Sequence, residues 1–158
     1  MVGSRDPRPH VVDARPHHGQ CRDVPAYTPD VDEPQTLYEA VGGMPFFERL
    51  VDRFYEGVAG DDVLLPLYPE PDDLAGARHR LTLFLAQYWG GPQTYSEERG
   101  HPRLRMRHAP FAIGPQARDR WLLHMREAVA ALEPSPPVTT ALHEYFDMAA
   151  EAMRNRDD

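Results

Sequence analysis

From residue 36 onward, apolar residues repeat at helical spacing, and no stretch alternates as a half-buried strand would. The clearest case runs from residue 47 to residue 58, where apolar side chains recur at i, i+3 or i+4. Pro45 suits the first turn of this helix, because that turn leaves its N–H groups unpaired. The pattern predicts an all-α fold. This first apolar face consists of Phe47, Leu50, Val51, Phe54 and Val58.

Glycine and proline divide the remaining pattern into further helices. Thr36 and Glu39 are spaced as a capping box, which predicts a short helix ending at Gly42-Gly43. We predict longer helices over 74–89, 115–132 and 140–154, a short one over 103–109, and one turn near 63–65. Residues 93–101 are expected to be irregular. The predicted buried face of the helix over 74–89 consists of Ala77, Leu81, Phe84, Leu85 and Tyr88.

Length and composition indicate one domain preceded by an extension. The chain has 158 residues, 41% hydrophobic and 27% charged, which is ordinary for a single soluble domain. Residues 1–34 contain many prolines and no apolar periodicity, so we expect a disordered or loosely attached extension before a domain at 35–158. His10, His17 and His18 fit a polar tail, with adventitious metal binding as the alternative.

Charge and hydropathy exclude several classes of partner. The net charge of −8 argues against general nucleic-acid binding. No apolar run approaches the roughly 20 residues that a membrane span needs, and no secretory signal is visible. Cys21 is the single cysteine, which rules out an intramolecular disulfide and fits a reducing compartment. We therefore expect a cytoplasmic protein without nucleic-acid partners or an integral membrane segment, and homo-oligomerisation stays open.

The short helix expected over 103–109 carries a candidate metal ligand. His108 lies near its end, and Pro110 stops it. A neutral imidazole is the usual axial ligand of globin and peroxidase iron. Arg103, Arg105 and Arg107 surround this histidine and could pair with haem propionates, although Arg107 lies on a different helical face. A capping or surface histidine beside a solvated arginine face is the alternative.

Two aromatic hydrogen-bond donors, Tyr55 and Trp121, lie on otherwise apolar helix faces. A buried Tyr hydroxyl or Trp N–H normally finds a partner, either a backbone carbonyl or, beside haem, the diatomic ligand. Dioxygen on haem carries partial negative charge, and two bonds of roughly 1.5 kcal/mol each would slow its release by about two decades. Tyr68 would be a third donor. Ala77 and Leu81, one turn apart, would leave the same space open.

A series of short motifs runs along residues 36–153, and their order resembles that of the truncated haemoglobins of group II. The glycine pairs and the stretch His108-Ala109-Pro110-Phe111 contribute most to this resemblance. The matching segments are residues 37–43, Arg53-Phe54-Tyr55, Tyr68-Pro69, residues 73–77, residues 87–92, Tyr95-Ser96-Glu97, Gly100-His101-Pro102, residues 106–111 and Trp121.

The resemblance implies a truncated globin fold, a two-over-two helical sandwich around haem b. It implies His108 as the proximal iron ligand and Tyr55 and Trp121 as distal donors, with Tyr68 at a position where many relatives carry an aromatic residue. Trp121 is the residue that separates group II from group I. Arg107 resembles the family's basic propionate partner, and Tyr95 is expected near the haem edge. The other cofactor-binding residues that we expect are Ala77, Leu81, Phe111 and Met106.

The function implied is tight binding of dioxygen and other small diatomic ligands at a five-coordinate haem iron. Slow release suits redox chemistry or detoxification of nitric oxide, peroxide or sulfide better than bulk oxygen transport. Nitric oxide dioxygenase and weak peroxidase activities are both hypotheses, and whether the protein is an enzyme stays open. No flavin or nicotinamide motif is visible, so an external reductase or reductant is expected. The alternatives are a haem-based ligand sensor or electron-transfer protein, and a helical interaction module without a cofactor.

Overall fold

The computed structural model describes residues 36–158. The predicted extension, its three histidines and Cys21 lie outside the described residues, so the predicted domain boundary stays a prediction. Among residues 36–158 the structure is helical and contains no strand. The elements are α1 (Leu37–Ala40), α2 (Met44–Ala59), the 3₁₀ turn η2 (Leu65–Leu67), α3 (Ala75–Tyr88), α4 (Thr94–Arg99), α5 (Leu104–His108), α6 (Pro115–Leu132) and α7 (Pro136–Met153).

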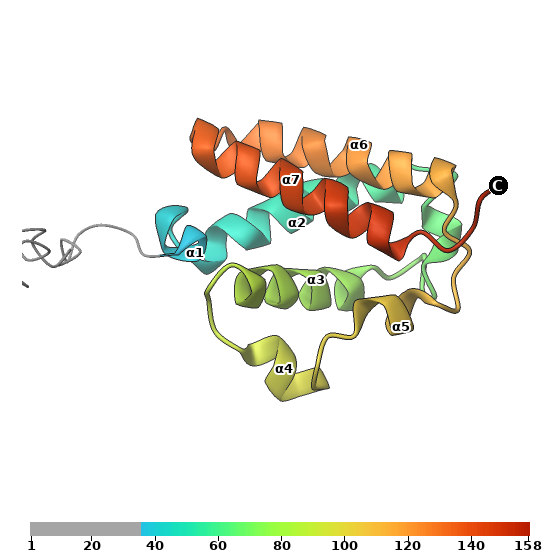
Figure 1. Ribbon diagram of the computed structural model, residues 1–158, viewed down its shortest axis with the longest axis horizontal. Helices are drawn as coiled ribbons and strands as arrows, with labels where there is room; N and C mark the ends of the chain where they lie inside the picture. The colour runs from blue at the N-terminus through green and yellow to red at the C-terminus, as the bar shows by residue number, and fades with distance from the viewer. Residues whose placement is uncertain (1–35) are drawn as a thin grey trace, which may run out of the picture. The chain divides into compact units, whose positions relative to one another are not determined.

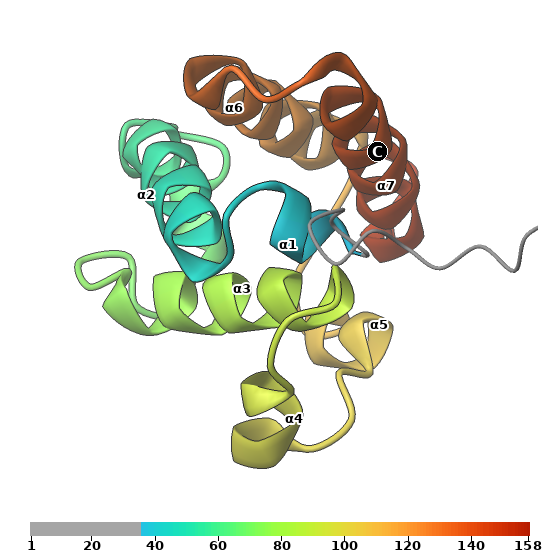
Figure 2. The same ribbon diagram turned by 90° about the vertical axis from the view of Figure 1, so that its left-hand side faces the viewer.

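Four long helices form the domain in two pairs. Helix α2 packs against α3, α6 packs against α7, and the contact between α2 and α6 joins the pairs (Figure 1). Viewed from the side, the short helices α4 and α5 lie beyond α3, on the side away from α6 (Figure 2). Helix α4 packs against α3, and α5 packs against α7. The expected all-α, two-over-two arrangement is confirmed.

Two glycine pairs bring the start of the domain onto the end of α3. Thr36 caps α1, because its hydroxyl oxygen accepts a hydrogen bond from the Glu39 N–H at 3.1 Å. The Tyr38 N–H then donates to the Trp89 carbonyl at 3.0 Å. A Cβ on Gly91 would lie 2.7 Å from the Tyr38 ring, so this close approach requires glycine. The sequence signal of the glycine pair is thus a packing requirement.

The hydrophobic core lies between the two helix pairs. Helix α2 buries a complete apolar face, as its periodicity predicts, and α6 and α7 cover that face from the other side. Within residues 36–158 no helix combines the length and hydropathy needed to cross a membrane. The largest fully buried side chains are Phe47, Phe54, Phe146, Leu50, Leu85, Met125, Leu142, Val51, Val58 and Val129.

The structure corrects three predicted segments. Residues 94–99 form α4 rather than an irregular loop, and α3 holds this helix in place: the Ser96 N–H donates to the Gln87 side-chain oxygen at 3.0 Å. Helix α7 begins at Pro136 instead of residue 140, because prolines occupy the first turn, where no N–H partner is needed. The turn expected near 63–65 lies at 65–67.

Tyr88 was predicted to be buried but is 49% exposed. Tyr88 is the last residue of α3, so no following turn of the helix covers its side chain. Its ring stacks on Tyr145 of α7, with centroids 4.1 Å apart. Periodicity places a residue on a helix face, but it does not show how far the neighbouring helix extends.

Candidate haem site

The proximal side of the candidate site is the short helix α5, which ends at His108. The His108 Nδ1 lies 2.7 Å from the Leu104 carbonyl oxygen, one turn earlier. A carbonyl only accepts hydrogen bonds, so Nδ1 carries the proton and the lone pair is left on Nε2. This tautomer is typical of metal-ligating histidines, whose second nitrogen donates to a carbonyl or carboxylate. A partly buried imidazole in this state fits an axial ligand to iron.

Arg107 organises the loop that leads into α5. Its Nε donates to the Pro102 carbonyl at 2.7 Å, and its Nη2 donates to the Arg99 carbonyl at 2.9 Å. Its guanidinium also lies over the Tyr95 ring, 6.0 Å from the centroid. Most of its donors are therefore used within the protein, which leaves Nη1 for a propionate. The expected roles of Arg107 and Tyr95 at haem stay predictions.

Sequence analysis missed Asn155, which holds the segment that follows His108. The Asn155 side-chain amide donates to the Phe111 carbonyl at 2.8 Å and to the His108 carbonyl at 3.3 Å. Its oxygen accepts from the Ile113 N–H at 2.9 Å. The chain just beyond α7 therefore fixes the backbone at His108. No local pattern in the sequence predicts this contact between segments more than forty residues apart.

The distal side begins with two tyrosines in contact. Tyr55 is buried on α2, and its ring centroid lies 5.7 Å from that of Tyr68, which directly follows η2. Burial raises the pKa of the Tyr55 hydroxyl, and a hydrogen bond from Tyr68 lowers that pKa in part. Burial also raises the pKa of Tyr68, and its interaction with Tyr55 adds to this effect. Both groups therefore stay protonated donors at neutral pH.

Trp121 of α6 lies next to the same cluster. Its ring makes edge contacts with Phe54 and Phe146, with centroids 5.3 and 5.7 Å away. Phe54 in turn contacts Tyr55, so the predicted distal donors are joined through one phenyl ring. Trp121 is partly exposed, and its indole N–H forms no hydrogen bond within residues 36–158. The donor is therefore available to a ligand.

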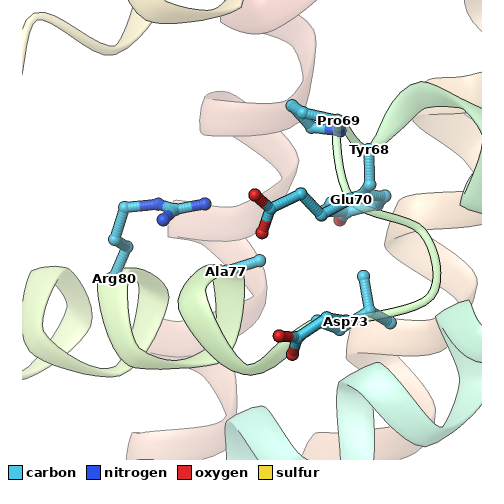
Figure 3. Close-up of a pocket in the computed structure, with 7 residues that line it drawn as sticks. Tyr68, Pro69, Glu70, Asp73, Ala77 and Arg80 are labelled. Atoms are coloured by element: carbon cyan, nitrogen blue, oxygen red, sulfur yellow. The ribbon is translucent and has the colours of Figure 1, made fainter.

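A cavity of about 140 Å³ lies where the corner before α3 meets the first turns of that helix (Figure 3). Tyr68 and Ala77, both expected to face the ligand, contribute to its wall. In the close-up, the Arg80 guanidinium and the Glu70 carboxylate point toward one another beside Ala77. Arg80 forms no ion pair within residues 36–158, so its charge is available to an anion at the cavity. The residues that line the cavity are Tyr68, Pro69, Glu70, Asp73, Leu74, Ala77 and Arg80.

The remaining predicted residues lie in different places. Tyr95 of α4 is buried against Phe84 of α3, while Leu81 and Phe111 are partly buried. Met106 is 66% exposed and lines a separate shallow groove between α5 and the end of α7. Arg80, one turn after Ala77, was not singled out from the sequence. The sequence signal that could have identified Arg80 is its i, i+3 spacing from Ala77, which places both residues on the same face of the helix.

Comparison with known proteins decides what this arrangement is. A family model described as a bacterial-like globin matches residues 36–155. The group 2 truncated haemoglobin YjbI of Bacillus subtilis is 38% identical over 121 residues, which is 77% of this chain and 89% of that protein. The chain belongs to the group II truncated haemoglobins. Membership implies that this globin binds haem and small diatomic ligands such as oxygen.

Solved structures of relatives agree with the fold of the globin. A thermostable haemoglobin from Thermobifida fusca is 60% identical, with a TM-score of 0.75 over 78% of this chain and 99% of that one. The haemoglobin of Chloroflexus aurantiacus is 52% identical, with the same TM-score over 78% of this chain and 100% of that one. The matched length therefore includes nearly all of each relative.

Proposed function

We propose that the globin binds haem b with His108 as its proximal ligand and holds dioxygen tightly between Tyr55, Tyr68 and Trp121. The observation that carries this proposal is the bond from the His108 Nδ1 to the Leu104 carbonyl, which leaves the Nε2 lone pair for iron. The haem iron supplies the position where a diatomic ligand binds and the electron for its reduction. The side chains of this protein supply orientation and hydrogen bonds.

The two tyrosines have different roles on the distal side. The two hydroxyls interact, and we assign the Tyr68 hydroxyl as the donor to the Tyr55 oxygen. The Tyr55 proton then remains for the ligand, and the Trp121 N–H provides a second donor. Two such bonds, each worth about 1.4 kcal/mol, slow ligand release by roughly a hundredfold. We assign both tyrosines as protonated donors and not as ligands of ferric iron, which favours a five-coordinate iron over a six-coordinate electron-transfer protein.

Arginines are available for the haem propionates. Arg80 lines the cavity beside Tyr68 and forms no ion pair with any residue from 36 to 158, and Arg107 keeps one nitrogen that none of those residues engages. Guanidinium groups hold carboxylates through paired, permanently charged donors. We assign Arg80 as the principal propionate partner, because the donors of Arg107 are mostly used by backbone carbonyls.

Tight binding favours redox chemistry on nitric oxide over oxygen transport. Nitric oxide, dioxygen and one electron combine to give nitrate, and an external reductant must return that electron after each turnover. We place this reaction in the cytoplasm, because a single cysteine suits a reducing compartment. Weak peroxidase activity is a second candidate, favoured by three oxidisable side chains in one cluster: Tyr55, Tyr68 and Trp121.

The test is to mix the oxygenated ferrous globin with nitric oxide and to measure the products. We expect one nitrate for each haem within the mixing time. Nitrite as the main product, or release of oxygen before any oxidation, would contradict the proposed reaction. Turnover with peroxide no faster than that of free haemin would remove the peroxidase alternative.

A further inference from the structure

A partly buried histidine lies where three elements of the distal side meet. His124 belongs to α6, one turn after Trp121, and its side chain is 13% exposed. Its Nε2 lies 2.6 Å from the Asp61 Oδ2, and the Asp61 side chain is 2% exposed. A carboxylate oxygen accepts, so the imidazole donates from Nε2. This charge-assisted bond joins α6 to the corner that follows α2.

The other oxygen of Asp61 fixes that corner. Its Oδ1 accepts the Val63 N–H at 2.8 Å and the Leu64 N–H at 3.0 Å. Arg120 adds positive charge at 3.6 Å from Oδ2. The corner leads through η2 directly to Tyr68. One buried carboxylate therefore orients the backbone before Tyr68 with one oxygen and the helix of Trp121 with the other.

Helix α2 contacts the opposite side of the imidazole. Gly57 lies two residues after Tyr55, and a Cβ at this position would be 2.4 Å from the His124 Nδ1. This nitrogen is buried and has no hydrogen-bond partner within residues 36–158. Glu127 is the acidic group nearest to it, with 3.9 Å between Oε2 and Nδ1. The backbone of the Tyr55 helix is therefore packed directly on the ring.

We propose that His124 and Asp61 form a positioning pair that sets the spacing of Tyr55, Tyr68 and Trp121 and thereby the rate at which the diatomic ligand leaves. His124 contacts none of the three side chains through a hydrogen bond and acts on them through α2, the corner and α6. The proposal rests on the proposed function, since it assigns those three residues to the ligand. His124 and Asp61 are added here as the residues that hold those three side chains at fixed positions relative to one another.

The test compares substitutions at His124 that differ in the donor. His124→Gln keeps an N–H that can reach Asp61, whereas His124→Leu keeps the bulk and removes the donor. His143→Leu is the control, because it removes another partly buried imidazole, on α7, whose Nε2 has no partner within residues 36–158. Gly57→Ala presses on the ring without changing any hydrogen-bonding group.

Three quantities are measured on the full chain: oxygen release by stopped flow, the infrared stretching band of bound carbon monoxide, and hydrogen exchange at the Val63 and Leu64 amides. We expect His124→Leu and Gly57→Ala to speed oxygen release about threefold to tenfold, the effect of one weakened hydrogen bond. Both should broaden or shift the carbon monoxide band. Exchange at the two amides should rise in His124→Leu and stay near wild type in His124→Gln.

Unchanged oxygen release and an unchanged infrared band in both His124→Leu and Gly57→Ala would overturn the proposal, as would equal changes in His143→Leu. If His124→Leu does not fold, His124→Gln and Gly57→Ala test the proposal through the same measurements of oxygen release and of the carbon monoxide infrared band. A wild-type protein that binds no haem would refute the proposed function instead, and amide exchange would then show whether the pair still holds the corner.

Discussion

Replacing Trp121 with phenylalanine isolates the contribution of one distal donor. Phenylalanine keeps an aromatic ring at the position that contacts Phe54 and Phe146, at 5.3 and 5.7 Å between centroids in the native protein. The change removes the indole N–H, which has no partner within residues 36–158. The variant therefore loses a hydrogen bond to the ligand and little of its packing.

The expected magnitude follows from the value of one hydrogen bond. In a pocket lined by aromatic rings, a bond to a partly charged ligand is worth about 1.4 kcal/mol, at the upper end of the range for neutral groups. That energy corresponds to a tenfold faster release of oxygen. Tyr55→Phe should have a similar or larger effect, because removing the hydroxyl removes both its hydrogen bond to the ligand and its interaction with Tyr68.

The assay is stopped-flow displacement of oxygen by excess carbon monoxide, with Trp89→Phe as the matched control. Trp89 lies at the end of α3, and its buried N–H has no partner within residues 36–158, so its loss should leave release unchanged. An unchanged rate in Trp121→Phe would refute the assignment of this indole to the ligand. An equal acceleration in both variants would show that general loosening, and not the donor, controls release.

Three further substitutions test the supporting contacts. Asp61→Asn should lower the free energy of unfolding by about 2 kcal/mol in urea at neutral pH, because it removes a buried carboxylate that accepts hydrogen bonds from His124, Val63 and Leu64. Burial raises the pKa of Asp61, but the hydrogen bonds from His124, Leu64 and Val63 lower it by more, so the pKa is lowered overall. Ionised Asp61 therefore stabilises the folded protein above the ordinary pKa of a carboxyl group. This stabilisation is lost as pH falls through the pKa of Asp61 in the folded state, so the free energy of unfolding of the variant should depend less on pH in acid. A profile parallel to that of the wild type would contradict this. Asn155→Ala should speed amide exchange at Ile113 and haem transfer to an acceptor protein, whereas Arg156→Ala should not. Arg80→Leu should speed haem transfer severalfold, and a loss rate equal to that of the wild type would remove Arg80 as the propionate partner.

The long helices were predictable because each has a signal within its own sequence. Apolar periodicity predicted α2 and α6, and for α6 the predicted bounds of 115–132 are those observed. Helix α4 has six residues, too few for a period to show, and Gln87 holds it from outside. Local patterns thus predict elements that bury a face, and they fail where a short element depends on a distant side chain.

The candidate site divides in the same way. His108, Tyr55 and Trp121 could be selected because each is chemically unusual in its own segment. Asp61 and His124 could not be paired from the sequence, because 63 positions separate them and each alone resembles an ordinary polar residue. Asn155 was missed for the same reason, since its partners lie at and just beyond the end of α5, more than forty residues away, and become neighbours only after α7 has packed.

The most direct measurement is the absorption spectrum of the ferrous protein with oxygen, recorded beside His108→Ala. We expect a Soret band and a stable oxygenated spectrum for the wild type, and neither a bound haem of that type nor an oxygenated form for the variant. Added imidazole should restore part of the wild-type spectrum, since the variant lacks only the ring that we propose as the iron ligand. An oxygenated spectrum in His108→Ala equal to that of the wild type would contradict the assignment of the proximal ligand, on which the rest of the account depends.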